Sequence, residues 1–117
     1  MAAPLYLYTG PEFGEREDAI NQIKNSLKKK YGSVDEHLFY LVETPFNQVM
    51  TILQSGTLFS DAICIVCKNA ELLKKKDDLQ MISDWLASAE QSSVLVLSSD
   101  EISVDSKLEK IVPDTKQ

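Results

Sequence analysis

The sequence has 117 residues, of which 44% are hydrophobic and 26% are charged. This length fits one domain, and the composition excludes a disordered tail, a collagen-like repeat and a low-complexity linker. Twelve basic residues against 18 acidic ones give a net charge of −6, which disfavours direct binding to a nucleic-acid backbone. No apolar run is long enough to span a membrane, and the start lacks the features of a secretory signal. With only two cysteines, we expect a cytoplasmic domain without membrane contact.

Four short apolar runs predict β-strands at residues 5–8, 38–42, 63–67 and 94–97. Each run is continuous rather than alternating and is rich in β-branched and aromatic residues. This pattern is typical of strands that are buried on both faces of a parallel sheet.

Amphipathic segments between these runs predict helices. They cover residues 15–31, Pro45 to a stop at Gly56, 77–89 and, more weakly, 104–112. Gly32 is the expected stop of the first helix, and Thr44 is the expected N-cap of the second, with Pro45 at its first position. Strands that alternate with helices imply right-handed crossovers, so we predict one domain, residues 1–117, with a three-layer α/β/α parallel sheet.

The loop after the first predicted strand is the expected ligand position in an open α/β sheet. A phosphate-binding loop that starts at Gly10 would need Gly, Lys and Ser or Thr at positions 15, 16 and 17. The chain has Glu15, Arg16 and Glu17 there, and a carboxylate at the metal-binding hydroxyl position repels phosphates. We therefore predict a P-loop NTPase-like architecture with a degenerate nucleotide site.

The end of the third predicted strand supports the same interpretation. A working NTPase of this layout places a carboxylate there to hold Mg²⁺, whereas this chain has Lys68 and Asn69. Two losses at two required positions argue against ATP hydrolysis, so we expect no catalytic residue, metal or cofactor. A nucleotide-binding enzyme with an atypical phosphate loop is the alternative.

Cys64 and Cys67 form a C-x-x-C pair, which in a cytosolic α/β protein suggests a redox or metal site. Inside a strand, however, residues three apart point to opposite faces, so the two thiols cannot meet. His37 is the only histidine and completes no zinc set; we place it at the start of a strand, facing solvent. We interpret both cysteines as buried structural residues, and a redox domain remains a third hypothesis.

Two lysine triplets, Lys28–Lys30 and Lys74–Lys76, are candidate phosphate-binding patches. The dipole at a helix carboxyl terminus accounts for the first, and a solvated face accounts for the second.

Leu58 and Phe59 stand side by side just after the helix stop at Gly56. One interpretation is a hydrophobic contact that ties the loop to the last helical turn. The other is an exposed apolar pair that fills a pocket of a partner, since one desolvated pair can dominate an interface.

In this order and spacing, the segments resemble the N-terminal domain of the delta subunit of bacterial DNA polymerase III, the clamp loader. The resemblance covers essentially the whole chain and rests on residues 5–12, 57–60, 68–72 and 94–97. It implies an AAA+-like domain that has lost its ATP site. It also implies a non-catalytic accessory subunit of a DNA-directed DNA polymerase, a nucleotidyltransferase holoenzyme. In DNA replication that subunit binds the sliding clamp, the beta subunit, and helps to open its ring.

The family's clamp-binding element is a Leu-Phe pair that follows a Gln and a small residue. By resemblance these positions are Gln54, Thr57, Leu58 and Phe59, with Thr in place of the family's Ser. Delta subunits also carry a lid and a helical collar, so the resemblance implies that this chain is a fragment that lacks them. Contacts with other clamp-loader subunits are then expected in the absent regions, and contact with DNA only indirectly through the assembled loader.

Overall fold

The computed structural model describes residues 5–9, 13–55, 61–88 and 92–99. The elements in chain order are β1 (Leu5–Tyr8), α1 (Phe13–Tyr31), β2 (Val34–Tyr40), α2 (Phe46–Ser55), β3 (Ala62–Lys68), the 3₁₀ helix η1 (Ala70–Leu72), α3 (Lys76–Ser88) and β4 (Ser93–Ser98). This is the alternation predicted from the sequence. The predicted helix at 104–112 and the stop at Gly56 lie outside the described residues.

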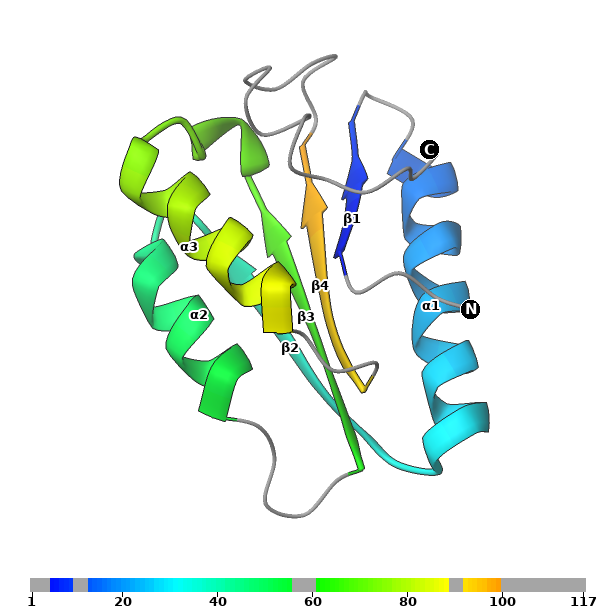
Figure 1. Ribbon diagram of the computed structural model, residues 1–117. Coiled ribbons are helices and arrows are strands. Elements are labelled where there is room, and N and C mark those ends of the chain that lie inside the picture. Colours follow the sequence, from blue (N-terminus) through cyan, green and yellow to red (C-terminus); the bar gives the residue numbers. More distant parts are fainter. Residues whose placement is uncertain (1–4, 10–12, 56–60, 89–91, 100–117) are drawn as a thin grey trace.

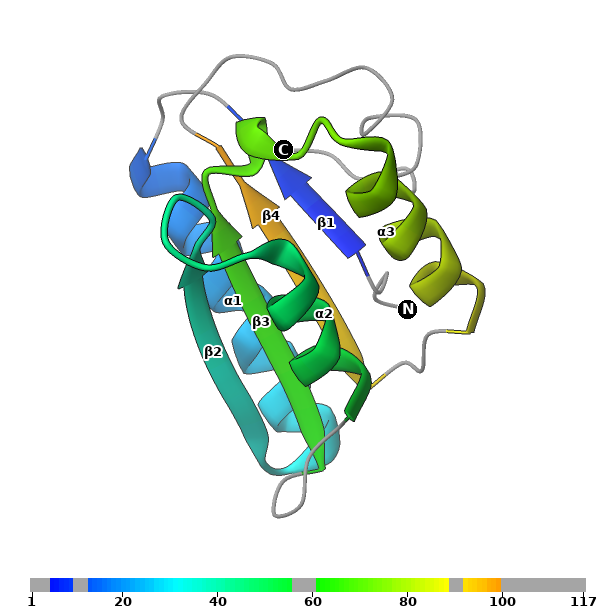
Figure 2. The ribbon, with the colours of Figure 1, turned by 90° about the vertical axis from the view of Figure 1, so that its left-hand side faces the viewer.

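The four strands form one sheet in the order β1-β4-β3-β2, and every pair is parallel. Helix α1 covers one face, and α2 and α3 cover the other (Figures 1 and 2). The predicted three-layer α/β/α parallel sheet is therefore confirmed. Because all four strands are parallel, their carboxyl ends lie along one side of the sheet, which we call the carboxyl edge.

Each face of the sheet carries its own apolar core, and β3 contributes to both. Ile63, Ile65 and Cys67 pack with the α2 and α3 side, whereas Cys64 and Val66 pack with the α1 side. Residues 62–67 of β3 are all buried, as a strand covered by helices on both faces must be. The helices bury the apolar side chains that recur every three or four residues in the sequence. In α2 these are Phe46, Val49, Met50 and Leu53.

The prediction for the second strand was wrong in its bounds and in its burial. β2 runs from Val34 to Tyr40 and pairs only with β3 among the described strands. Its side chains alternate between half-buried and exposed, and Leu38 and Tyr40 are 53% and 45% exposed. Edge position alone does not explain this exposure, since β1 at the other edge of the sheet is mostly buried; Leu38 and Tyr40 instead line an open pocket at the carboxyl end of the sheet. The backbone turns after Tyr40, whose carbonyl accepts hydrogen bonds from the N–H groups of Glu43 and Thr44.

The helix boundaries differ from expectation by one or two residues. α1 begins two residues earlier, at Phe13. It ends as predicted, because Gly32 adopts a φ of 93° and donates its N–H to the Lys28 carbonyl. α2 begins at Phe46, so Pro45 precedes the helix instead of opening it. No described helix has the length and apolar character that a membrane crossing requires.

Candidate functional site

The carboxyl edge brings together the side chains that the sequence placed in a degenerate nucleotide site. Helix α1 supplies Arg16 and Glu17 from its first turns, and the end of β3 supplies Lys68 and Asn69. They line a pocket of about 240 Å³ together with Ser98 of β4 and two side chains of β2. Glu15 is exposed, and Gly10 lies outside the described residues.

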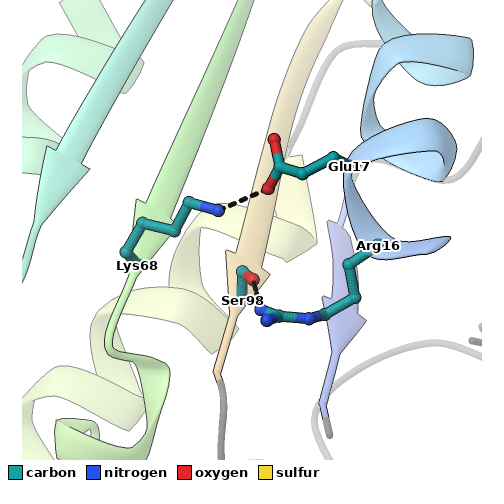
Figure 3. Close-up of polar contacts among 4 residues, drawn as sticks. All are labelled: Arg16, Glu17, Lys68 and Ser98. Atoms are coloured by element: carbon teal, nitrogen blue, oxygen red, sulfur yellow. Dashed lines mark hydrogen bonds and ion pairs between the residues drawn. The ribbon is translucent and has the colours of Figure 1, made fainter. Parts of the chain in front are cut away.

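Lys68 and Glu17 form an ion pair across this pocket (Figure 3). The Lys68 Nζ donates a hydrogen bond of 2.6 Å to the Glu17 Oε2, and the two side chains are 16% and 35% exposed. Glu17 stands at the position expected for a metal-binding hydroxyl and Lys68 at that expected for a metal carboxylate. The sequence suggested two separate departures from the NTPase pattern, and the structure shows that these two side chains contact each other.

Arg16 points into the same edge rather than to solvent. Its side chain is almost completely buried, and its Nη1 donates a hydrogen bond of 2.7 Å to the Ser98 Oγ (Figure 3). The contact ties the start of α1 to the end of β4, across 82 residues of sequence. Sequence reasoning missed Ser98, because no motif marks it and only the strand order places it beside Arg16.

The turn after β3 completes the edge. Asn69 adopts a left-handed conformation with a φ of 67°, which Asn tolerates better than most residues. Its buried Oδ1 has no hydrogen-bond partner among the described residues. Glu71, in the 3₁₀ helix that follows Asn69, reaches the residue after β4: its Oε1 accepts a hydrogen bond of 2.6 Å from the Ser99 Oγ. Within the described part of the chain, no group of three or more His, Cys, Asp or Glu residues could hold a metal ion.

The charges at this edge disfavour a nucleoside triphosphate. Arg16 and Lys68 supply two positive charges, but Glu17 already neutralises one of them at hydrogen-bond distance. A bound triphosphate would have to break this pair and lie beside the freed carboxylate. Both changes cost free energy in a partly desolvated site.

The cysteines behave as the strand geometry predicted. Cys64 and Cys67 belong to the two cores on opposite faces of the sheet, and both are fully buried free thiols. Burial raises the pKa of Cys64 to about 11 and that of Cys67 to about 12. The thiolate needed for redox or metal chemistry is therefore disfavoured. His37 does not open a strand as predicted; it lies within β2, half-buried, with its Nε2 3.2 Å from the Asp35 Oδ2.

Of the predicted clamp-binding residues, only Gln54 lies within the described residues. It is exposed near the end of α2. Thr57, Leu58 and Phe59 lie outside the described residues, so their exposure stays a prediction.

A second, larger groove of about 670 Å³ lies between the beginnings of α2 and α3. Its walls include Phe46, Leu72 and Met81, with Lys75 and Asp78 among its polar residues. The apolar residues of α2 and α3 predicted that the two helices pack against the sheet. No sequence motif predicted a groove between their first turns.

Comparison with known proteins tests the fold. No family model and no curated protein matches the sequence. Among solved structures, the DNA clamp loader delta protein (YqeN) of Bacillus subtilis is similar, with a TM-score of 0.72 and 20% sequence identity. The similarity covers 94% of this chain and 35% of that protein, so the chain spans about a third of its length. The resemblance suggested by the sequence is thus confirmed at the level of the fold: the chain folds like the corresponding part of a clamp loader delta protein.

Proposed function

We propose that this chain is a non-catalytic domain of a bacterial-type clamp-loader subunit, which binds a sliding clamp and helps to open its ring during DNA replication. The observation that carries the proposal is the fold similarity to a clamp loader delta protein over 94% of the chain. The domain then acts in the cytoplasm as an accessory to a DNA polymerase, within an assembly whose ATP-hydrolysing sites belong to other subunits.

The carboxyl edge supports a role without ATP. The Glu17–Lys68 pair and the Arg16–Ser98 hydrogen bond join α1 to β3 and β4 through the protein's own side chains. In this proposal the pair occupies the place that a nucleotide and its metal would take in an active relative. The domain therefore keeps its shape without a bound cofactor.

Clamp binding is assigned to Gln54, Thr57, Leu58 and Phe59. Burial of a leucine and a phenylalanine in a pocket of the clamp contributes roughly 1.5–3 kcal/mol of binding free energy for each side chain. Gln54, exposed near the end of α2, adds a hydrogen-bonding side chain to the proposed element. Contacts with other loader subunits are assigned to the remainder of a longer protein, and DNA contact to the assembled loader, consistent with the net charge of −6.

The test is binding of the purified chain to the sliding clamp of the same organism. The Leu58→Ala/Phe59→Ala variant should lose on the order of 100-fold or more in affinity, at 1.4 kcal/mol per tenfold. Gln54→Ala should lose about tenfold or less, the value of one hydrogen bond. The melting temperatures of both variants should stay near that of the parent.

Val42→Ala/Leu72→Ala is the matched control, because these two side chains are 65% and 46% exposed and come from other segments. The control should bind the clamp like the parent chain. Unchanged affinity of the Leu58/Phe59 variant contradicts the proposed element, and a collapse of its fold favours the contact between the loop and the helix end.

A further inference from the structure

The outer edge of β2 faces away from the rest of the sheet along the whole strand. β2 lies at one side of the sheet, and no described strand or helix lies beyond it (Figure 2). The Leu41 N–H donates to the Lys68 carbonyl, and the Ser33 carbonyl accepts from the Ala62 N–H, so the odd-numbered residues bond to β3. The N–H groups of the even-numbered residues from Val34 to Tyr40 therefore point away from β3, and no described strand accepts from them.

The sequence of β2 contains none of the devices that usually protect an edge strand. Natural edge strands are kept from pairing by lysine, proline, a β-bulge or short length. The seven residues of β2 include neither lysine nor proline, and their register with β3 is continuous from Val34 to Tyr40. By contrast, β1 at the other edge has four residues and is mostly buried. Among the described strands, β2 is therefore the one that can accept another strand.

The charges along this edge balance each other. The Glu36 Oε1 lies 3.7 Å from the Lys24 Nζ, and its Oε2 lies 3.4 Å from the Lys28 Nζ. Asp35 is the second carboxylate of the strand, so two carboxylates face two ammonium groups. The other charged groups near the strand lie at its carboxyl end: the Glu17–Lys68 ion pair and Glu43. A second copy of the chain therefore meets little net repulsion along this edge, although each copy carries a net charge of −6.

We propose that β2 pairs antiparallel with β2 of a second copy, across a two-fold axis at His37, so that two four-stranded sheets become one. This is the register in which every residue of the strand has a partner, and the same surface of both copies forms the contact. Val34 then lies opposite Tyr40 of the second copy, and Glu36 lies opposite Leu38. An aromatic side chain opposite a β-branched one is a favourable cross-strand pair.

The other face of the paired strands fits the same register. Asp35 lies opposite Phe39 of the second copy, so no like charges of β2 face each other directly. Leu38 and Tyr40, which are 53% and 45% exposed in one copy, gain contacts across the new pair. One strand edge is a small contact beside the about 1,200–2,000 Å² of a standard interface, so we expect a weak dimer that forms as concentration rises. This dimer goes beyond the proposed function and uses none of the residues assigned to clamp binding.

Sedimentation of the purified chain over a range of concentrations should show a monomer–dimer equilibrium. Leu38→Lys should weaken the dimer about tenfold or more, because it removes a leucine contact and places a charge on the pairing edge. Leu72→Lys is the matched control, since it makes the same substitution at a leucine that is 46% exposed and lies outside the strand. The control should dimerise like the parent chain.

The register is tested by a cysteine at the proposed two-fold axis. In an antiparallel pair without direct hydrogen bonds, the two Cα atoms at position 37 are about 4.5 Å apart, which suits a disulfide. His37→Cys should therefore give a covalent dimer on mild oxidation. Tyr40→Cys should not, because its two copies lie about 20 Å apart along the paired strands. The native Cys64 and Cys67 are buried and do not compete.

Hydrogen exchange adds a residue-by-residue measurement. The amides of Glu36 and Leu38 should exchange more slowly as the dimer forms, whereas those of His37 and Phe39, which already face β3, should change little. A chain that stays monomeric at every concentration overturns the inference. Equal cross-linking by both cysteine variants, or equal weakening by both lysine variants, overturns it as well. If Leu38→Lys does not fold, cross-linking of His37→Cys against Tyr40→Cys decides the outcome.

Discussion

Lys68 at the end of β3 and Glu17 in the second turn of α1 are joined by a 2.6 Å contact across the carboxyl edge of the sheet. A P-loop NTPase of this layout holds phosphate and metal at the corresponding strand ends, and here two oppositely charged side chains meet instead. Both residues depart from the NTPase pattern, and their contact offers one physical reason for both departures. At this half-buried edge the ion pair favours the charged forms of both side chains.

The first prediction concerns this pair. Glu17→Gln and Lys68→Met should each lower the free energy of unfolding. The double variant should lose less of it than the sum of the two single losses. We expect a coupling of about 1 kcal/mol, the upper end for partly exposed pairs, from urea unfolding of the four chains. The Lys28–Glu36 pair, which is longer at 3.4 Å and has a 55% exposed lysine, should show a smaller coupling. Equal couplings for the two pairs would count against a special role for Lys68.

The second prediction concerns nucleotide. Calorimetric titration with ATP and Mg²⁺ should show no binding, because the Glu17–Lys68 pair must open and place a carboxylate beside the phosphates. Glu17→Gln removes that carboxylate and should be the first variant to gain weak affinity. Micromolar binding by the parent chain that is lost in Lys68→Met would favour the nucleotide-binding alternative.

The third prediction concerns the buried arginine. Ser98→Ala removes the hydroxyl that accepts from the Arg16 Nη1 and takes an acceptor away from a buried charged group. The variant should lose about 2 kcal/mol of unfolding free energy, within the range for hydrogen bonds to charged groups. Ser26→Ala, on the exposed face of α1, should change stability by less than about 0.5 kcal/mol. A neutral Ser98→Ala would mean that Arg16 finds another acceptor.

The fourth prediction concerns pH. Burial raises the pKa of Cys64 and Cys67 above the ordinary value of 9.0, to about 11 and about 12. From pH 9.0, the ordinary thiol pKa, up to these raised values, the unfolded chain loses thiol protons that the folded chain keeps. The free energy of unfolding therefore falls as the pH rises through this range. Urea unfolding at about pH 8 and about pH 10 should show this loss, and Cys64→Ala/Cys67→Ala should show a shallower one. Equal slopes would mean that the thiols ionise normally in the fold.

Much of the fold could be predicted from the sequence, because hydrophobic spacing reports which faces are covered. The run at residues 63–67 is continuous and lies at the centre of the sheet, and its burial agrees with the prediction. The run at 38–42 has a similar composition but belongs to an edge strand that ends at Tyr40. Composition does not say which strand is central, since strand order depends on crossovers between distant segments.

The sequence by itself determined the alternation of strands and helices, the opposite faces of Cys64 and Cys67, and the absence of phosphate-loop residues at Glu15, Arg16 and Glu17. These properties follow from local periodicity and from side-chain chemistry at fixed spacing. Only the tertiary structure decided that Glu17 meets Lys68 and that Arg16 meets Ser98. Each contact joins residues more than fifty positions apart, and it forms because β4 lies between β1 and β3 and brings three strand ends to the start of α1.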